Sequence, residues 1–102
     1  MRADEQEEVT QRLRSARGHL KATFSMLDAG EPCEIVLHQL GLVQAALGAA
    51  ITELLACQLR QCQEVIRHSA IAEDRAAELA RFLILYCLLT KNSKYIGRYQ
   101  ND

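Results

Sequence analysis

Four cysteines are the residues of this chain best suited to chemistry: Cys33, Cys57, Cys62 and Cys87. The segment ACQLRQC holds two of them, but not at the two-residue gap of a zinc knuckle or a thioredoxin-type redox pair. Cys57 and Cys62 are five residues apart. That separation is about 140° around a helix, so the two thiols face different directions. Gln58 and Cys62, at i and i+4, share one helix face.

The residue at position 58 decides which chemistry Cys62 can take part in. A histidine there would complete a Cys/His/Cys set suited to a soft metal ion such as Cu(I), for which Gln58 is a poor ligand. The remaining pair of thiols, Cys33 and Cys62, suits thiol oxidation or persulfide chemistry. A buried cysteine is often only a small apolar residue. Spacing alone does not decide whether Cys33 and Cys62 have a chemical or a purely structural role. For Cys57, and for Cys87 inside LILYCLL, we expect a structural role.

Three helices are predicted to position these cysteines, and nothing predicts strands. The first spans about residues 5–28, where Gly30 fits the C′ position after its end. Pro32 fits the first turn of a second helix that spans residues 32–68 without a strong breaker. The third spans about residues 71–91. Apolar residues recur every three or four positions in the first helix and mark one face: Val9, Leu13, Ala16, Leu20, Phe24 and Leu27.

The second predicted helix is too long to be covered by its own chain. About 36 residues would measure about 54 Å, whereas a compact chain of this size is about 26 Å across. We therefore expect an all-α, three-helix subunit with one very long central helix, paired with a second copy in an antiparallel four-helix-bundle dimer. Cys33 and Cys62 lie about 43 Å apart along such a helix. They cannot meet within one chain, but Cys33 of one subunit can approach Cys62 of the other.

Composition limits the classes of protein to consider. The 102 residues predict one domain, residues 1–102, with an acidic segment 1–8 and a polar tail 92–102 that we expect to be mobile. The start MRADEQEEV is not a signal peptide, and we expect the apolar stretches to fall short of the ~20 residues of a membrane span. These features predict a cytoplasmic protein with no membrane partner, in which cysteines are free thiols, metal ligands or redox sensors.

Basic side chains could supply a local DNA-binding face, although the net charge of −1 gives no overall attraction to DNA. Arg14, Arg17 and Lys21, at i, i+3 and i+7, form one stripe on the first helix. Several copies would present a broad cationic face to phosphates. The alternative is a set of ordinary solvated charges. The full set of candidates is Arg12, Arg14, Arg17, Lys21, Arg60 and Arg67.

Two other classes of protein are the alternatives to a DNA-binding protein. If the basic residues are ordinary surface charges, the chain is a helical interaction module with no role on DNA. An enzyme is not predicted, because His19, His38 and His68 have no Ser, Cys or carboxylate partner at a useful spacing.

Two segments resemble the CsoR/RcnR/FrmR family of small all-helical bacterial repressors. RLRSARGHLKATFSMLDAGEPC is similar to the family's opening, and HQLGLVQAALGAAITELLACQLRQC is similar to its long-helix core. The resemblance covers roughly residues 9–66. Cys33, position 58 and Cys62 fall at the family's ligand spacing without gaps. The resemblance implies a dimer of dimers, a homotetramer, that binds operator DNA without a helix-turn-helix.

The resemblance also implies which chemical inducer the protein senses. Copper-sensing members have Cys, His and Cys at the three ligand positions, which here read Cys33, Gln58 and Cys62. A member with both cysteines but no histidine resembles the persulfide-responsive branch, the CsoR-like sulfurtransferase repressors (CstR), in which thiols of different subunits become joined. This likeness implies Cys33 and Cys62 as the sensing pair, reactive sulfur species as inducer and no cofactor. The alternative is a repressor of the same family that senses Cu(I), with the same two thiols as ligands, or another metal. Cys57 lies near this site, and Glu78 falls where copper sensors place a carboxylate of the third helix.

Overall fold

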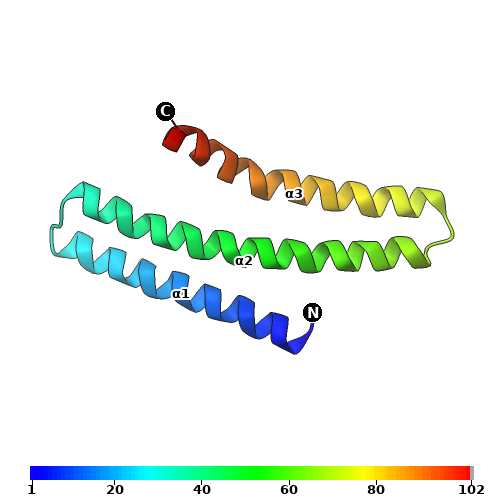
Figure 1. Ribbon diagram of the computed structural model, residues 1–102, viewed down its shortest axis with the longest axis horizontal. Coiled ribbons are helices and arrows are strands. Elements are labelled where there is room, and N and C mark those ends of the chain that lie inside the picture. The colour runs from blue at the N-terminus through cyan, green and yellow to red at the C-terminus, as the bar shows by residue number, and fades with distance from the viewer. Residues whose placement is uncertain (102) are drawn as a thin grey trace. The chain divides into compact units, whose positions relative to one another are not determined.

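The computed structural model contains three helices and no strand within the described part of the chain, which is residues 1–101 for the backbone and 1–90 for the side chains (Figure 1). The helices are α1 (Ala3–Asp28), α2 (Cys33–His68) and α3 (Ala72–Asn101). This confirms the predicted all-α subunit with one long central helix. The predicted end of the third helix near residue 91 is wrong. No proline interrupts the polar tail, and a single glycine costs a helix only about 1 kcal/mol. We also expect residues 92–102 to be mobile, and their side chains lie outside the described part of the chain.

Gly30 ends α1 as its sequence position predicts. Its φ of 71° lies in the left-handed region, which favours glycine. The Gly30 N–H donates to the Leu27 carbonyl at 3.1 Å, and the Glu31 N–H donates to the Met26 carbonyl at 3.0 Å. These two bonds form a Schellman motif and satisfy carbonyls that the helix end leaves unpaired. The chain then reverses, and the carbonyl of Pro32 accepts the first bonds of α2.

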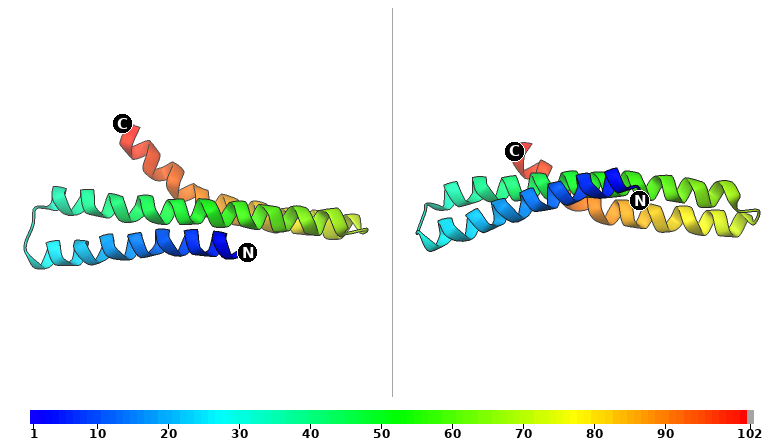
Figure 2. Two further views of the ribbon diagram at one scale, coloured as in Figure 1. Left: turned by 60° about the horizontal axis from the view of Figure 1, so that its bottom comes forward. Right: turned by 90° about the horizontal axis from the view of Figure 1, so that it is seen from below.

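The chain divides into two compact units, residues 1–53 and 54–102, and α2 runs through the boundary. In the first unit, α1 and the first part of α2 form an antiparallel pair (Figure 2). In the second unit, the remainder of α2 is followed by α3. The organisation as a single domain stays a prediction.

A seven-residue repeat forms the buried contact of the first unit. A seven-residue spacing returns side chains to one stripe where helices pack in the manner of a coiled coil. Small side chains at these positions let two helix backbones approach closely. We call this set the seam: Val9, Ala16 and Thr23 of α1, with Val36, Val43 and Ala50 of α2. The Thr23 hydroxyl donates to the His19 carbonyl at 2.9 Å, so its polar group is satisfied although the residue is 3% exposed.

Leucines follow the seam along one edge. Each stands four residues after a seam residue, and because α1 and α2 are antiparallel, the +4 positions of both helices lie on the same edge. Their side chains remain between 41% and 57% exposed. We call this set the leucine face: Leu13, Leu20 and Leu27 of α1, with Leu40 and Leu47 of α2. The predicted apolar stripe of the first helix thus divides into a buried seam and an exposed leucine face.

Polar residues stand at most of the positions on the opposite edge that follow a seam residue by three. The Gln39 side-chain amide donates to the His19 carbonyl at 3.2 Å and lies 3.2 Å from His19 Nδ1. Further along the pair, Arg12 Nε donates to Glu53 Oε1. We call this side the polar edge. The two edges of the α1–α2 pair therefore differ in kind, one apolar and exposed, the other joined by hydrogen bonds and ion pairs.

Within the described residues, α2 is long and apolar enough by length and composition to cross a membrane. Residues 35–52 contain no Asp, Glu, Lys or Arg. The expectation that no apolar stretch reaches the length of a membrane span is therefore wrong, since glutamine, glycine and histidine interrupt the hydrophobic pattern without adding charge. The same composition is found in the core helices of soluble helical proteins.

Candidate functional site

Cys62 has the most buried side chain among residues 54–90 of the second unit. Its side chain is 1% exposed, and Leu55, one seven-residue repeat earlier on α2, is 9% exposed. The Cys62 Sγ lies 3.8 Å from the backbone carbonyl of Glu78 on α3 and donates to it. The thiol is therefore covered by α3 and makes a weak hydrogen bond to the main chain.

Glu78 and Arg81 form an ion pair beside this thiol. The Glu78 side chain is 13% exposed, whereas the Arg81 side chain is 72% exposed. The hydrogen bond and charge of Glu78 raise the pKa of Arg81 above its ordinary value. The structure thus brings Glu78 next to Cys62, through its backbone, while its carboxylate is engaged with Arg81. Arg81 was missed in the sequence, where its signal was the i, i+3 spacing from Glu78.

Cys33 has a very different environment. It is the first residue of α2 and is exposed, directly after the turn at Gly30. The two candidate sensing thiols therefore belong to different units of the chain, one open to solvent and one covered.

The remaining cysteines differ from each other. Cys57 is 8% exposed and its Sγ lies 3.9 Å from the Gln61 side-chain nitrogen, as suits a structural residue. Cys87 is exposed, so the expectation that it packs in the core is wrong for this chain. The apolar residues of LILYCLL occupy all sides of α3, and in the single chain Ile84 is 70% and Leu88 66% exposed.

The donor set at the three ligand positions offers two soft thiols and one amide. Gln58 is half-buried on α2, one turn before Cys62. Among the residues with described side chains, no group of three or more His, Cys, Asp or Glu is placed to hold a metal ion. The thiols of Cys33 and Cys62 are ligands that suit Cu(I), and Gln58 adds no soft donor.

The basic candidates fall into two groups. Arg14, Arg17 and Lys21 are exposed on α1, and none forms an ion pair with another described residue. Arg12 instead pairs with Glu53 and, at 3.6 Å, with Glu8. The hydrogen bond and charge of Glu53 are the main cause that raises the pKa of Arg12.

The second helix contributes its two basic candidates from the second unit. Arg60 and Arg67 are both exposed on α2. Arg67 pairs with Glu64 at 3.1 Å, a surface contact of the i, i+3 type. Such a pair is weak in water and leaves the arginine available to other anions.

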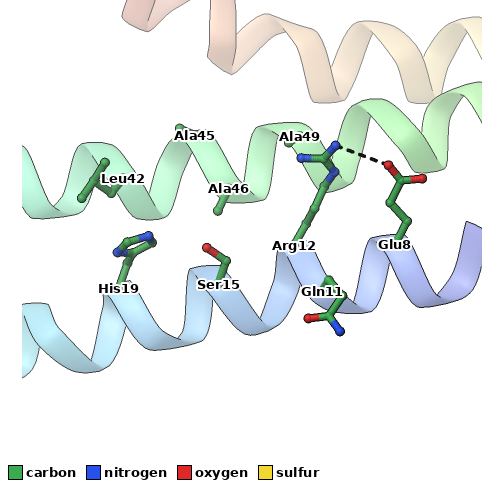
Figure 3. A pocket seen from close by; sticks show the side chains of 9 residues that line it. All are labelled: Glu8, Gln11, Arg12, Ser15, His19, Leu42, Ala45, Ala46 and Ala49. Atoms are coloured by element: carbon green, nitrogen blue, oxygen red, sulfur yellow. Dashed lines mark ion pairs between the residues drawn. The ribbon is translucent and has the colours of Figure 1, made fainter.

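A groove of about 500 Å³ runs along the polar edge between α1 and α2 (Figure 3). Ser15 and His19 project from α1 toward Ala46 and Leu42 of α2. Small residues of α2 form the floor, and Arg12 closes one end through its contact with Glu8. The groove was not predicted, because it depends on which side of each helix faces the other.

The described residues thus form an all-helical subunit whose 36-residue central helix has the exposed Cys33 at its start and the buried Cys62 near its end. The model of the metal-sensitive transcriptional repressor family matches residues 5–84, and the chain belongs to this family. No curated protein and no solved structure shows a significant match to the chain.

Family membership settles the broad function. The chain is a transcriptional repressor of the CsoR/RcnR type, and this class acts by binding DNA. The family is not one of enzymes, which agrees with the prediction from the isolated histidines. Repression of transcription implies a cytoplasmic location, so α2 is interpreted as the central helix of a repressor and not as a membrane span.

Proposed function

We propose that this repressor senses reactive sulfur species, persulfides or polysulfides, through Cys33 of one subunit and Cys62 of the partner subunit. The observation that carries this proposal is the donor set on α2: two thiols at the ligand positions, with Gln58 where a metal sensor needs a third soft or imidazole ligand. Thiolates attack sulfane sulfur, the electrophilic sulfur atom of a persulfide, and need no third ligand for this reaction.

The chemistry proceeds in two balanced steps. The exposed Cys33 thiolate attacks the sulfane sulfur of a low-molecular-weight persulfide, RSSH. The S–S bond of the donor breaks, RSH leaves, and Cys33 becomes a persulfide. The thiolate of Cys62 of the partner subunit then attacks the Cys33 sulfur, and hydrogen sulfide leaves with the electron pair. The two thiols are oxidised to an intersubunit disulfide, and the sulfane sulfur is reduced to sulfide.

Exposure supports this order of reaction. Cys33 is exposed at the start of α2, whereas Cys62 is 1% exposed beneath α3. A reagent in solution reaches Cys33 first, because reactivity requires access as well as thiolate character. The bridge requires local movement of α3 away from Cys62. That movement would link thiol oxidation to a change in helix packing and release operator DNA.

Assembly of the site requires two copies of the chain. The leucine face leaves five leucines at least 41% exposed along one edge of the α1–α2 pair. A second copy packed antiparallel on this face would complete a four-helix bundle and bury these side chains. Two such dimers would form the proposed tetramer and place the stripe of Arg14, Arg17 and Lys21 on DNA phosphates.

A Cu(I) sensor of the same family is the second candidate. The family description, metal-sensitive transcriptional repressor, favours it. Thiolates bind Cu(I) well, and Cys33 with Cys62 of the partner subunit would supply two of them. In this alternative the metal is the signal, and its binding would bring the two thiolates together without oxidation.

Intact mass spectrometry and DNA binding together test the proposal. The wild type, Cys33→Ala, Cys62→Ala and the matched control Cys87→Ala are treated anaerobically with a glutathione persulfide donor. We expect covalent dimers and loss of binding to the DNA upstream of its own gene in the wild type and Cys87→Ala only. Persistent DNA binding after donor treatment, together with DNA release by stoichiometric Cu(I), would replace the sulfur proposal with the copper one. No binding of the reduced protein to DNA would reject both.

A further inference from the structure

Arg12 and Glu53 form a contact across the polar edge that the proposed DNA-binding role does not explain. They are 41 residues apart in sequence, on α1 and α2 of the first unit, and Arg12 Nε donates to Glu53 Oε1. The Glu53 side chain is 23% exposed and that of Arg12 42% exposed. The pair is therefore partly shielded from water, which strengthens it relative to a fully exposed pair.

A second carboxylate shares the same guanidinium. Glu8 Oε1 lies 3.6 Å from an Arg12 terminal nitrogen, on the side drawn with a dashed line in Figure 3. One positive and two negative charges leave this cluster with a net negative charge. A DNA phosphate that approaches Arg12 therefore meets repulsion from Glu8 and Glu53 as well as attraction.

Carboxylate and phosphate oxygens compete for the same donors. An arginine binds either anion through the same fork of N–H groups, in similar geometry. A phosphate can use the Nε side of Arg12 only by displacing Glu53. By contrast, Arg14 and Arg17 are exposed without an ion pair to another described residue, so they can contact phosphates directly.

Building on the proposed function, we propose that Glu53 is an internal competitor of operator phosphate for Arg12 and thereby lowers the affinity of the repressor for DNA. In the wild-type complex this competition keeps Arg12 out of the phosphate contacts. Glu53 then acts on DNA affinity entirely through Arg12, with no contact of its own to the nucleic acid.

The consequence is measurable as affinity and as salt dependence. Each additional phosphate contact steepens the slope of log K against log salt concentration by about 0.9. Glu53→Gln removes the carboxylate charge at nearly constant shape. It should steepen the slope by about 0.9 for each copy whose Arg12 reaches a phosphate. When salt falls from about 200 to 50 mM, the affinity of Glu53→Gln should then rise by roughly three-fold more per contact than that of the wild type.

The experiment uses the full reduced protein and a fluorescent duplex from upstream of its own gene, measured by anisotropy over a salt series. The variants are Glu53→Gln, Arg12→Ala and the double variant Arg12→Ala/Glu53→Gln. Glu7→Gln is the matched control, because Glu7 is an exposed α1 carboxylate that accepts from Gln11 and not from Arg12. Circular dichroism checks that each variant keeps its helices.

The expected result is tighter binding and a steeper slope for Glu53→Gln than for Glu7→Gln, and no gain from Glu53→Gln when Arg12 is already alanine. If Glu53→Gln does not fold, Glu8→Gln tests the same idea, and it should give a smaller gain. Wild-type binding with no difference between the glutamine variants would overturn this inference and leave the proposed function intact. A gain that survives in the Arg12→Ala background would also overturn it. Absence of binding by every protein, wild type included, would reject the proposed function and this inference with it.

Discussion

The leucine face gives a quantitative prediction about self-association. Leu47 lies four residues after the seam residue Val43 and is 41% exposed in the single chain. Complete burial of a leucine side chain contributes about 1.5–3 kcal/mol, so covering the exposed fraction contributes about 0.6–1.2 kcal/mol per copy. Two-fold symmetry places two copies of Leu47 in the same interface. Leu47→Ala should therefore weaken the dimer by about 1–2 kcal/mol, which is roughly a 5–30-fold rise in its dissociation constant.

Sedimentation equilibrium over a range of protein concentrations measures this constant directly. Leu42→Ala is the matched control, because it removes the same atoms from α2 on the side of the groove, where the side chain is 48% exposed. We expect the control to associate as the wild type does. If Leu47→Ala leaves association unchanged while Leu42→Ala weakens it, the leucine face is not the interface, and the proposed bundle is built on the wrong edge.

Further predictions follow from single positions. Gly30→Ala should lower the free energy of unfolding by about 1–2 kcal/mol, because alanine is strained at a φ of 71° although space is open around it, and urea denaturation should show a shifted midpoint with an unchanged m-value. Timed alkylation with N-ethylmaleimide, followed by peptide mass spectrometry, should modify Cys33 well before Cys62, and equal rates would contradict the covered position of Cys62. Arg81→Ala should lower the alkylation rate of Cys62, because it removes a positive charge near the thiol and leaves the Glu78 carboxylate unpaired, which disfavours the reactive thiolate. An unchanged rate would show that burial beneath α3 alone limits the reaction. Gln58→His should raise the affinity for Cu(I) in a competition titration with a chromogenic chelator, and no gain would mean that position 58 does not face the thiol pair.

The sequence predicts the helices well because their limits have strong local causes. Gly30 and Pro32 mark the turn between α1 and α2, and the absence of a breaker up to His68 predicts the long helix. The sequence predicts too early an end for α3, because its apolar periodicity is lost near residue 91 while the helix continues to Asn101. A polar segment without proline can remain helical, since periodicity indicates which side is buried and not whether the backbone is helical.

The site was predicted only in part, for a geometric reason. The spacing of Cys33, Gln58 and Cys62 is visible along one helix, and family membership is consistent with it. Two other features of the site join residues on different helices. α3 covers Cys62 of α2, and Arg12 of α1 contacts Glu53 of α2. Periodicity identifies the apolar stripe of each helix but not the edge that turns toward its neighbour. The sequence therefore predicts Arg12 only as a further DNA-binding candidate beside the basic stripe, although the fold gives it two carboxylate partners.

The contrast between the two edges of the α1–α2 hairpin has a consequence for how such a repressor can diversify. Positions that follow the seam by four residues are leucines, while positions that follow it by three include the charged pair. Because the two sets lie on opposite edges of the α1–α2 pair, a substitution in one set does not touch the other. Under the proposed function, substitutions on the polar edge would change DNA affinity and substitutions on the leucine face would change self-association, so the two properties could be altered in separate steps.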